Sequence, residues 1–154
     1  MRVLLQRVSS ASVSVDGGMC GQIGAGLVAL VGIHQQDTLA DADFCADKCV
    51  HLRVFADGEG RFDRSLLDVC GQMLAISQFT LYGDCRKGRR PFFGDAAAPD
   101  LAEPLYEAFI SRVRTHQVTV ACGVFGAHMD LEIHNDGPVS LFIDSPTTPT
   151  QGAP

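Results

Sequence analysis

The chain has 154 residues, 46% of them hydrophobic, which fits one compact domain that can bury a core without disulfides or metal. Its 12 Lys and Arg against 18 Asp and Glu leave a net charge of −6, so the molecule as a whole repels phosphate and any nucleic-acid contact requires a local basic patch. The longest apolar run is too short for a bilayer and no secretory signal is evident, which predicts a cytoplasmic protein without a membrane partner.

The N-terminal third is expected to form strands joined by hairpins. Residues 12–15 alternate Ser and Val, and Asp16-Gly17-Gly18 follows as a tight-turn signal. Leu27 to Ile33 is a continuous apolar run, which predicts a strand buried on both faces.

Two amphipathic helices are predicted far apart in the chain. Thr38 and Asp41 resemble a capping box that starts a helix from about residue 38 to 53, and Cys45 and Cys49 share one face of it. None of the six cysteines forms a C-x-x-C pair, so they are interpreted as small buried hydrophobic residues. A second helix is predicted from about residue 100 to 114. Its buried face is expected to contain Leu101, Leu105, Ala108 and Phe109, with Arg112 at the rim.

The remaining strands are predicted around two irregular segments. Residues 72–81 form one expected strand, followed by a Gly-rich basic loop from Gly83 to Gly94. Residues 131–135 and 139–143 are predicted to form a hairpin around a turn at Asp136-Gly137-Pro138.

The order of these elements predicts the fold class. Strands outnumber helices, and the helices do not alternate with every strand, which favours an α+β fold with a largely antiparallel, barrel-like β-sheet and two amphipathic helices. Residues 1–144 are predicted to form a single domain. The Pro- and Thr-rich residues 145–154 are predicted to form a disordered tail.

Common catalytic and metal-binding signatures are missing from the sequence. The five histidines show no H-E-x-x-H or paired Cys/His spacing, so neither a metal site nor a cofactor is predicted. The glycines between residues 17 and 26 lack the Lys-Ser/Thr ending of a phosphate loop. There is no G-x-S-x-G nucleophile motif, so an enzyme with this sequence would use unusual machinery.

Three polar side chains interrupt the end of the apolar strand at Ser77-Gln78-Phe79-Thr80. Strand alternation predicts Ser77 and Phe79 on one face and Gln78 and Thr80 on the other. Polar groups at such a place are either satisfied structurally or used functionally, and the local sequence leaves both interpretations open.

A second segment of interest is Gly137-Pro138. Its surroundings are those of an ordinary β-turn. Glycine before proline also permits a cis peptide bond and leaves carbonyl oxygens open to a ligand.

The loop after residue 83 concentrates positive charge in an acidic protein. Arg86, Lys87, Arg89 and Arg90 lie within five residues. Two interpretations stay open: the loop is simply solvated, or its cations bind phosphates.

In order and spacing, these segments resemble the D-aminoacyl-tRNA deacylase family from Met1 to about Ile143. The matching segments are Leu5-Gln6-Arg7-Val8, Gly24-Ala25-Gly26-Leu27, Ser77-Gln78-Phe79-Thr80, Arg90-Pro91, Gly123-Val124-Phe125-Gly126-Ala127 and Asn135-Asp136-Gly137-Pro138. The resemblance implies a hydrolase that cleaves the ester bond at the 3′ end of D-aminoacyl-tRNA, releasing D-amino acid and tRNA. It also suggests action on glycyl-tRNA mischarged on alanine tRNA.

The resemblance further implies a homodimer in which a cis Gly137-Pro138 peptide enters the partner's active site and rejects L-aminoacyl-tRNA. Ser77, Gln78, Phe79 and Thr80 would line the pocket, with main-chain N–H groups near Phe79 and Thr80 as an oxyanion hole. Arg86, Lys87, Arg89 and Arg90 are the candidates for contact with tRNA. One departure from the family pattern is Ser140, where a threonine is usual.

Two mechanisms and two other functions stay open at this point. In the family, a ribose hydroxyl of the terminal adenosine is thought to assist water attack, and the older alternative makes Thr80 the nucleophile. A non-catalytic dimeric tRNA-binding module of the same fold is one alternative function. A hydrolase of free small esters is the other.

Overall fold

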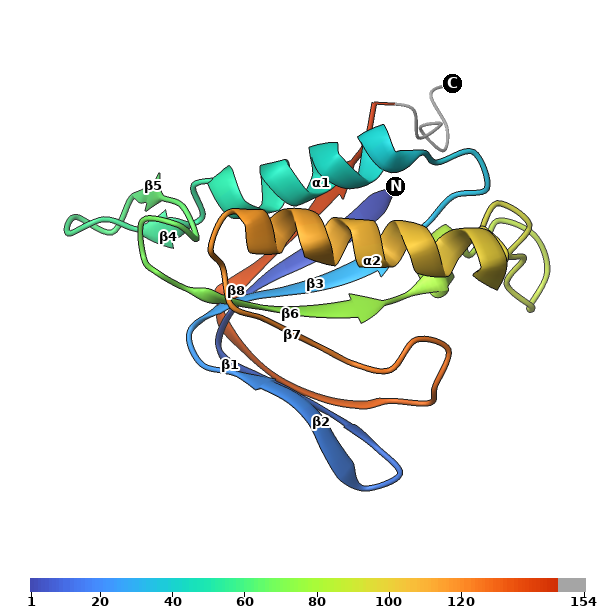
Figure 1. The fold of residues 1–154 in the computed structure, drawn as a ribbon, viewed down its shortest axis with the longest axis horizontal. Coiled ribbons are helices and arrows are strands. Elements are labelled where there is room, and N and C mark those ends of the chain that lie inside the picture. Colours follow the sequence, from blue (N-terminus) through green and yellow to red (C-terminus); the bar gives the residue numbers. More distant parts are fainter. Residues whose placement is uncertain (147–154) are drawn as a thin grey trace.

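A computed structural model describes residues 1–146, which form a strongly curved β-sheet with two helices on one face (Figure 1). The central strand is β1 (Arg2–Val15). Its antiparallel partners are β2 (Gly18–Ile23), β3 (Gly26–Gly32) and β8 (Asp130–Asp144). On its other side, β3 pairs in parallel with β6 (Gln72–Ser77), and β6 pairs in parallel with β7 (Val120–Cys122). The predicted α+β fold with a largely antiparallel, barrel-like sheet is confirmed.

The N-terminal strands follow the sequence prediction closely. Val15 pairs with Gly18, so Asp16 and Gly17 form a two-residue turn, and both have positive φ (49° and 77°). This is the backbone that Asp-Gly favours in tight hairpins. A second, small hairpin joins β4 (Phe55–Ala56) to β5 (Phe62–Arg64).

The first helix, α1 (Leu39–His51), begins as its capping sequence predicts. The Thr38 backbone N–H and hydroxyl both donate to the Asp41 carboxylate at 2.8 Å. Cys45 and Cys49 are fully buried on one face, which confirms their interpretation as core residues. The same interpretation was wrong for Cys20, Cys70 and Cys85, which are exposed on the edge strand β2, in a turn and in a loop. Burial raises the pKa of the Cys45 thiol to about 12, so this thiol is not a nucleophile near neutral pH.

The second helix, α2 (Pro99–Thr115), buries a row of side chains that matches the prediction in part, since Leu105 and Phe109 are buried as predicted. Leu101 is 37% exposed and Ala108 is only half-buried. The buried face contains Ala102, Leu105, Tyr106, Phe109, Ile110 and Val113. The centre of the buried face is rotated about the helix axis relative to the predicted one, so the prediction was wrong for Leu101 and Ala108 only.

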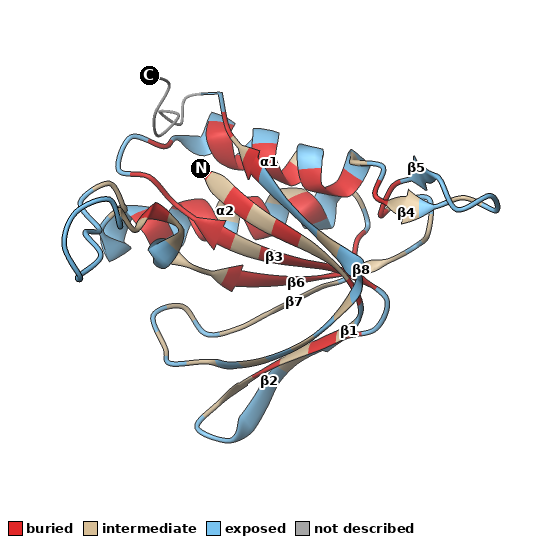
Figure 2. Ribbon diagram, turned by 180° about the vertical axis from the view of Figure 1, so that it is seen from behind, coloured by how far each residue is buried: buried red, intermediate tan, exposed pale blue. Residues whose placement is uncertain are grey.

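Figure 2 shows β3 and β6 buried along most of their length. Two apolar clusters share these strands. On the helix side, Leu27, Ala29 and Val31 pack with residues of α1 and α2. On the other side, Val28 and Leu74 pack inside the curl of the sheet. Burial of both faces explains the continuous apolar run predicted as a buried strand.

The strand predicted for residues 72–81 is shorter than expected. β6 ends at Ser77, and a 3₁₀ turn, η1 (Phe79–Tyr82), follows Gln78. The Gln78 N–H donates to the Val31 carbonyl at 2.8 Å, and the parallel partner β3 ends one residue later at Gly32. Beyond Gly32 there is no β3 backbone for the chain to pair with, so the chain turns after Gln78. The predicted alternation of Ser77 to Thr80 across two faces of a strand was therefore wrong.

The hairpin predicted at Asp136-Gly137-Pro138 was also wrong. β8 runs in one direction and pairs with β1 on both sides of this segment, with Asn135 opposite Val8 and Ser140 opposite Gln6. Residues 136–139 therefore bulge from the ladder opposite a single residue, Arg7. These turn-forming residues create a bulge rather than a hairpin because β1 is long enough to pair with β8 both before and after them.

The described chain ends close to its N-terminus. Ser145, which the sequence prediction places in the tail, is buried, and its N–H donates to the Met1 carbonyl at 2.8 Å. The tail residues from 147 onward lie outside the described residues. No helix within residues 1–146 is long and apolar enough to cross a membrane.

Candidate active site

A pocket of about 560 Å³ opens at the carboxyl ends of the parallel strands β3 and β6. Carboxyl ends of parallel strands are a common place for ligands because adjoining loops surround them. Lining residues come from these strand ends, from residues 93–102 at the start of α2, and from residues 125–131. Ser77, Gln78 and Phe79 are among them, so three of the four predicted catalytic residues line one pocket.

The backbone after β6 leaves two hydrogen-bond donors free. Gln78 donates its N–H to Val31, and the next N–H with an acceptor is that of Leu81, which donates to the Gln78 carbonyl at 3.3 Å. Within residues 1–146, the N–H groups of Phe79 and Thr80 between them have no protein acceptor. Two adjacent free N–H groups can stabilise the oxyanion formed when an ester carbonyl is attacked.

Thr80 lies beside this pocket and is exposed rather than part of its lining. Its hydroxyl oxygen accepts a short hydrogen bond from Nε2 of Gln78. An amide N–H cannot take up a proton, and in the described part of the chain no His, Asp or Glu bonds to this hydroxyl. The geometry thus supplies no general base for Thr80.

The pocket is also lined by residues that were not predicted to have a role in the site. Phe93 packs its ring against Phe79 with centroids 5.1 Å apart, and the pair forms one rim. The segment from Phe125 to Met129 forms another part of the wall and includes His128. The glycines of this segment indicate an irregular backbone, but nothing in the local sequence predicts that the segment lies against the pocket. Within residues 1–146, no group of three or more His, Cys, Asp or Glu is placed to hold a metal ion.

The Gly137-Pro138 peptide is cis and exposed at the top of the β8 bulge. Gly137 has a φ of +143°, and Asn135 supports the bulge by accepting the Val139 N–H at its Oδ1 (2.8 Å). Arg7 donates from Nε to the Asp136 carbonyl at 3.0 Å. The bulge is therefore held from both sides of its base.

Within one chain, the bulge and the pocket are far apart. Arg7, opposite the bulge, pairs with Leu27 of β3, whereas Ser77 pairs with Val31. The four residue steps between Leu27 and Val31 correspond to roughly 13 Å along the strand. Neither Gly137 nor Pro138 lines the pocket. A single copy thus does not bring the two predicted site segments together.

Ser140, the departure from the family pattern, has a defined structural place. Its hydroxyl accepts hydrogen bonds from the side-chain amides of Gln6 (3.1 Å) and Asn135 (3.2 Å). A serine can make both contacts as a threonine would, because neither uses the methyl group.

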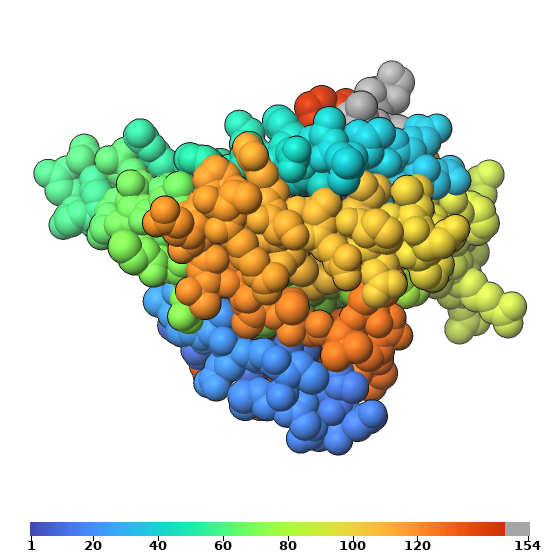
Figure 3. All heavy atoms as spheres, in the orientation of Figure 1, coloured from blue at the N-terminus to red at the C-terminus, as the bar shows by residue number. Residues whose placement is uncertain are grey.

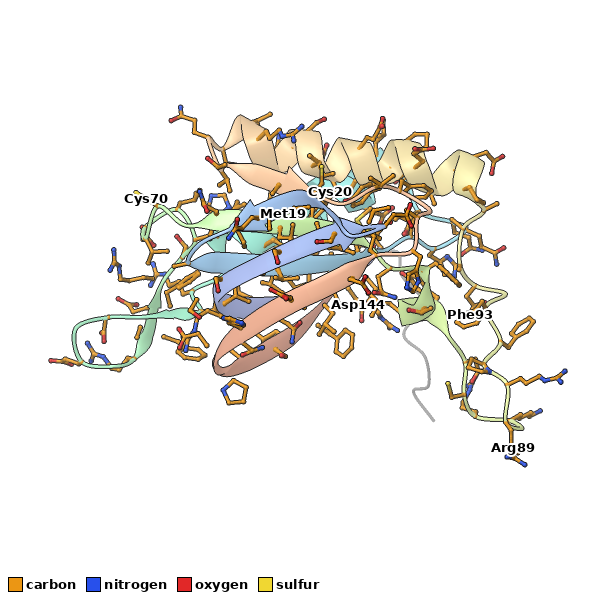
Figure 4. The ribbon with its side chains drawn as sticks, turned by 90° about the horizontal axis from the view of Figure 1, so that it is seen from below. Met19, Cys20, Cys70, Arg89, Phe93 and Asp144 are labelled. Atoms are coloured by element: carbon orange, nitrogen blue, oxygen red, sulfur yellow. The ribbon has the colours of Figure 1, made fainter. Side chains whose placement is uncertain are left out.

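The basic loop forms a closed projection next to the pocket rim. Asp84 and Phe92 pair through two backbone hydrogen bonds of 2.7 and 2.9 Å and so close the loop at its base. Figure 4 shows Arg89 at the tip of this loop and Phe93 near its base, and the loop projects from the body in Figure 3.

The four cations of this loop are not equivalent. Arg86 donates to both carboxylate oxygens of Asp84 at 2.9 and 2.7 Å, and this hydrogen bonding lowers the pKa of Asp84 to about 2. In the described chain, Lys87, Arg89 and Arg90 are exposed and form no ion pair, although the charge of Lys87 also helps to lower the pKa of Asp84. Three cations without an ion pair therefore remain beside the pocket.

Comparison with known proteins agrees with this architecture. The family model described as D-Tyr-tRNA(Tyr) deacylase matches residues 4–144. A D-aminoacyl-tRNA deacylase of Fervidobacterium nodosum is 55% identical over 145 residues, covering 94% of this chain and 97% of that protein. One of Thermus aquaticus is 56% identical over 149 residues, covering 97% and 98%.

Two solved structures share the fold. The one titled c-Myc DNA Unwinding Element Binding Protein is 36% identical with a TM-score of 0.89, covering 96% of this chain and 100% of that chain. A probable eukaryotic D-amino acid tRNA deacylase is 19% identical with a TM-score of 0.82, covering 93% and 98%. On the family match and the close relatives, this chain belongs to the D-Tyr-tRNA(Tyr) deacylase family.

Proposed function

We propose that this chain hydrolyses the ester bond of D-aminoacyl-tRNA and releases free D-amino acid and tRNA. The observation that carries the proposal is the pair of free N–H groups of Phe79 and Thr80 beside the pocket. Attack on an ester carbonyl places negative charge on its oxygen, and loss of one such donor in other enzymes costs on the order of 10² to 10³ in rate. The pocket has the size of a small-ligand site, suited to the aminoacyl end of the substrate.

Water is the proposed nucleophile. It adds to the ester carbonyl carbon, the bond to the ribose oxygen breaks, and the ribose oxygen leaves with a proton. Because the ester is already activated, positioning and oxyanion stabilisation supply most of the catalysis. We assign assistance in moving the proton to the neighbouring ribose hydroxyl of the substrate, since Thr80 contacts an amide rather than a base.

Chirality is proposed to be decided by Gly137 and Pro138 of a second copy in a homodimer. Their carbonyls would accept hydrogen bonds from the substrate ammonium and occupy the space that an L side chain needs. The exposed Phe142, on β8 just after the bulge, supports a second copy next to this strand. Phe142 is 65% exposed, a large apolar area for an isolated chain.

The same exclusion predicts the breadth of substrates. A D side chain would point away from the filter, so many amino acids should be accepted. Glycine has no side chain to exclude, so glycyl-tRNA mischarged on alanine tRNA is a further proposed substrate. Lys87, Arg89 and Arg90, which form no ion pair within residues 1–146, are proposed to contact tRNA phosphates, while Arg86 is held against Asp84.

The proposed function is tested by single-turnover incubation of the protein with D-tyrosyl-tRNA. We expect release of free D-tyrosine. Binding of the tRNA with an intact ester would instead identify a non-catalytic tRNA-binding module. Hydrolysis of small free esters with no action on the tRNA ester would identify a simple esterase.

A further inference from the structure

Phe92 is an exposed aromatic residue that the fold does not explain. It is 68% exposed, the largest fraction among the phenylalanines of residues 1–146. Most other exposed phenylalanine rings have a partner: Phe62 lies under Arg7, Phe142 under Arg2, and Phe79 against Phe93. In the described chain, Phe92 contacts no other ring and no cation.

The position of Phe92 is nevertheless fixed. Its backbone makes both hydrogen bonds of the bridge to Asp84, which closes the basic loop. Its ring lies over Gly94, where an added Cβ would come within 2.3 Å of Cζ of the ring. A ring that is held in place yet exposed to solvent is suited to receive another flat group.

The surroundings of Phe92 indicate which flat group it receives. On one side, Phe93 forms the rim of the pocket, and on the other the loop carries Lys87, Arg89 and Arg90, none of which forms an ion pair within residues 1–146. An aromatic ring beside free cations is the combination that binds single-stranded nucleic acid, because bases stack on the ring and phosphates pair with the cations.

We infer that Phe92 is a base-stacking site for an unpaired nucleotide next to the terminal one at the 3′ end of tRNA. This inference rests on the proposed function, in which the terminal aminoacyl-adenosine occupies the pocket. The preceding base then lies over Phe92 while its phosphates face the loop. Phe92 thereby holds the RNA, and the pocket carries out the hydrolysis.

The inference is tested by the equilibrium affinity of Phe92→Ala for uncharged tRNA, intact or shortened by its unpaired 3′ nucleotides. We expect a loss of roughly 5- to 100-fold on intact tRNA, as for removal of one stacking partner, and no change on the shortened tRNA. Phe92→Trp should bind intact tRNA as the wild type does, and Phe92→Leu should not. Phe44→Ala, which removes a phenylalanine from α1, is the matched control and should change nothing.

A second variant moves the ring without removing it. Gly94→Ala should displace the Phe92 ring and weaken binding of intact tRNA in the same direction. Unchanged affinity of Phe92→Ala, an equal loss on both tRNAs, or full affinity of Phe92→Leu would each overturn the inference. The last result would indicate a plain apolar contact, as with a protein partner.

Hydrolysis of a D-tyrosyl ester of adenosine separates this inference from the proposed function. This minimal substrate has no neighbouring base, so Phe92→Ala should cleave it as fast as the wild type, while cleaving subsaturating D-tyrosyl-tRNA more slowly. If the wild type cleaves neither substrate, the proposed function fails. The inference fails by itself if the wild type cleaves both and Phe92→Ala matches it on both.

Discussion

Arg7 holds the Asp136 end of the exposed bulge on β8, with Nε 3.0 Å from the Asp136 carbonyl oxygen and 3.3 Å from its carboxylate. The same guanidinium donates from Nη1 to the Val54 carbonyl at 2.6 Å, and the side chain is only 11% exposed. A charged residue on a central strand thus ties the proposed chirality filter to the rest of the domain. Its planar set of donors makes this possible, and lysine offers no equivalent geometry.

Replacing Arg7 should therefore affect chirality more than folding. We expect Arg7→Lys to lower the ratio of kcat/KM for D- over L-tyrosyl-tRNA by roughly 10- to 100-fold, because small displacements in a site have effects of that size. Loss of the two backbone contacts should cost about 1 to 3 kcal/mol of unfolding free energy in urea. Arg53→Ala, which removes an exposed ion pair with Asp63, is the control. An unchanged ratio in Arg7→Lys would remove the positioning role.

Gly137 should tolerate no side chain. An added Cβ would lie 2.7 Å from Cγ2 and 2.9 Å from N of Val139, at a φ of +143° that L residues rarely adopt. Gly137→Ala should therefore distort the bulge and impair rejection of L-tyrosyl-tRNA, while the exposed position keeps the loss of unfolding free energy within about 1 to 3 kcal/mol. Gly58→Ala, at a site with open space, should behave as the wild type. Equal behaviour of the two variants in the L-substrate assay would count against the filter.

Thr80 should be dispensable as a nucleophile. Thr80→Val keeps the backbone N–H and the approximate shape while removing the hydroxyl. We expect hydrolysis of D-tyrosyl-tRNA to persist, rather than to fall by the order of 10⁶ seen when a true nucleophile is removed. Acid quench and mass spectrometry would detect a covalent acyl-enzyme. Its presence in the wild type and absence from Thr80→Val would show that Thr80 is the nucleophile.

Much of the fold follows from local sequence signals. The Asp16-Gly17 turn, the Thr38–Asp41 cap and the buried run of β3 each arise from interactions within a few residues, or from apolar periodicity alone. The sequence of α2 does not determine which of its faces is buried, because apolar residues recur at helical spacing from Leu101 and also from Ala102. The position of the sheet beneath the helix decides between the two faces.

The site depends on long-range pairing, and this limits prediction from sequence. Asn135 to Pro138 have the composition of a hairpin turn, and only the length of β1 makes them a bulge. The break after Ser77 depends on the end of β3 at Gly32, which lies far earlier in the chain. Local sequence signals therefore identified the residue types of the site. The free N–H groups of Phe79 and Thr80 were expected only from the family resemblance, because the backbone that leaves them free depends on this long-range pairing.

The contact between the two helices should make stability depend on pH. The Arg112 side chain, hydrogen-bonded to Asp47, and then His116 hold the pKa of that carboxyl at about 2, below its ordinary 3.8, although partial burial opposes this. A lowered pKa in the folded state stabilises the protein above about pH 4, and this contribution is lost as the pH falls toward about 2.

Asp47→Asn measures this contribution. Because the Asp47 side chain is 38% exposed and solvent screens the pair, the variant should lose at most about 1 kcal/mol of unfolding free energy near neutral pH. Denaturant titrations at falling pH should bring the two proteins together as the carboxyl protonates. Asp130→Asn, at an exposed position of β8 with no ion pair within residues 1–146, controls for the change in net charge. A constant difference at every pH would contradict the assignment.

The most direct test of the account is the rate of ester hydrolysis for D-tyrosyl-tRNA and L-tyrosyl-tRNA, measured side by side with the unmodified protein under single-turnover conditions. The free N–H groups of Phe79 and Thr80 predict cleavage of the D ester, and a filter of Gly137 and Pro138 predicts survival of the L ester. Equal hydrolysis of both esters, or of neither, would contradict the account.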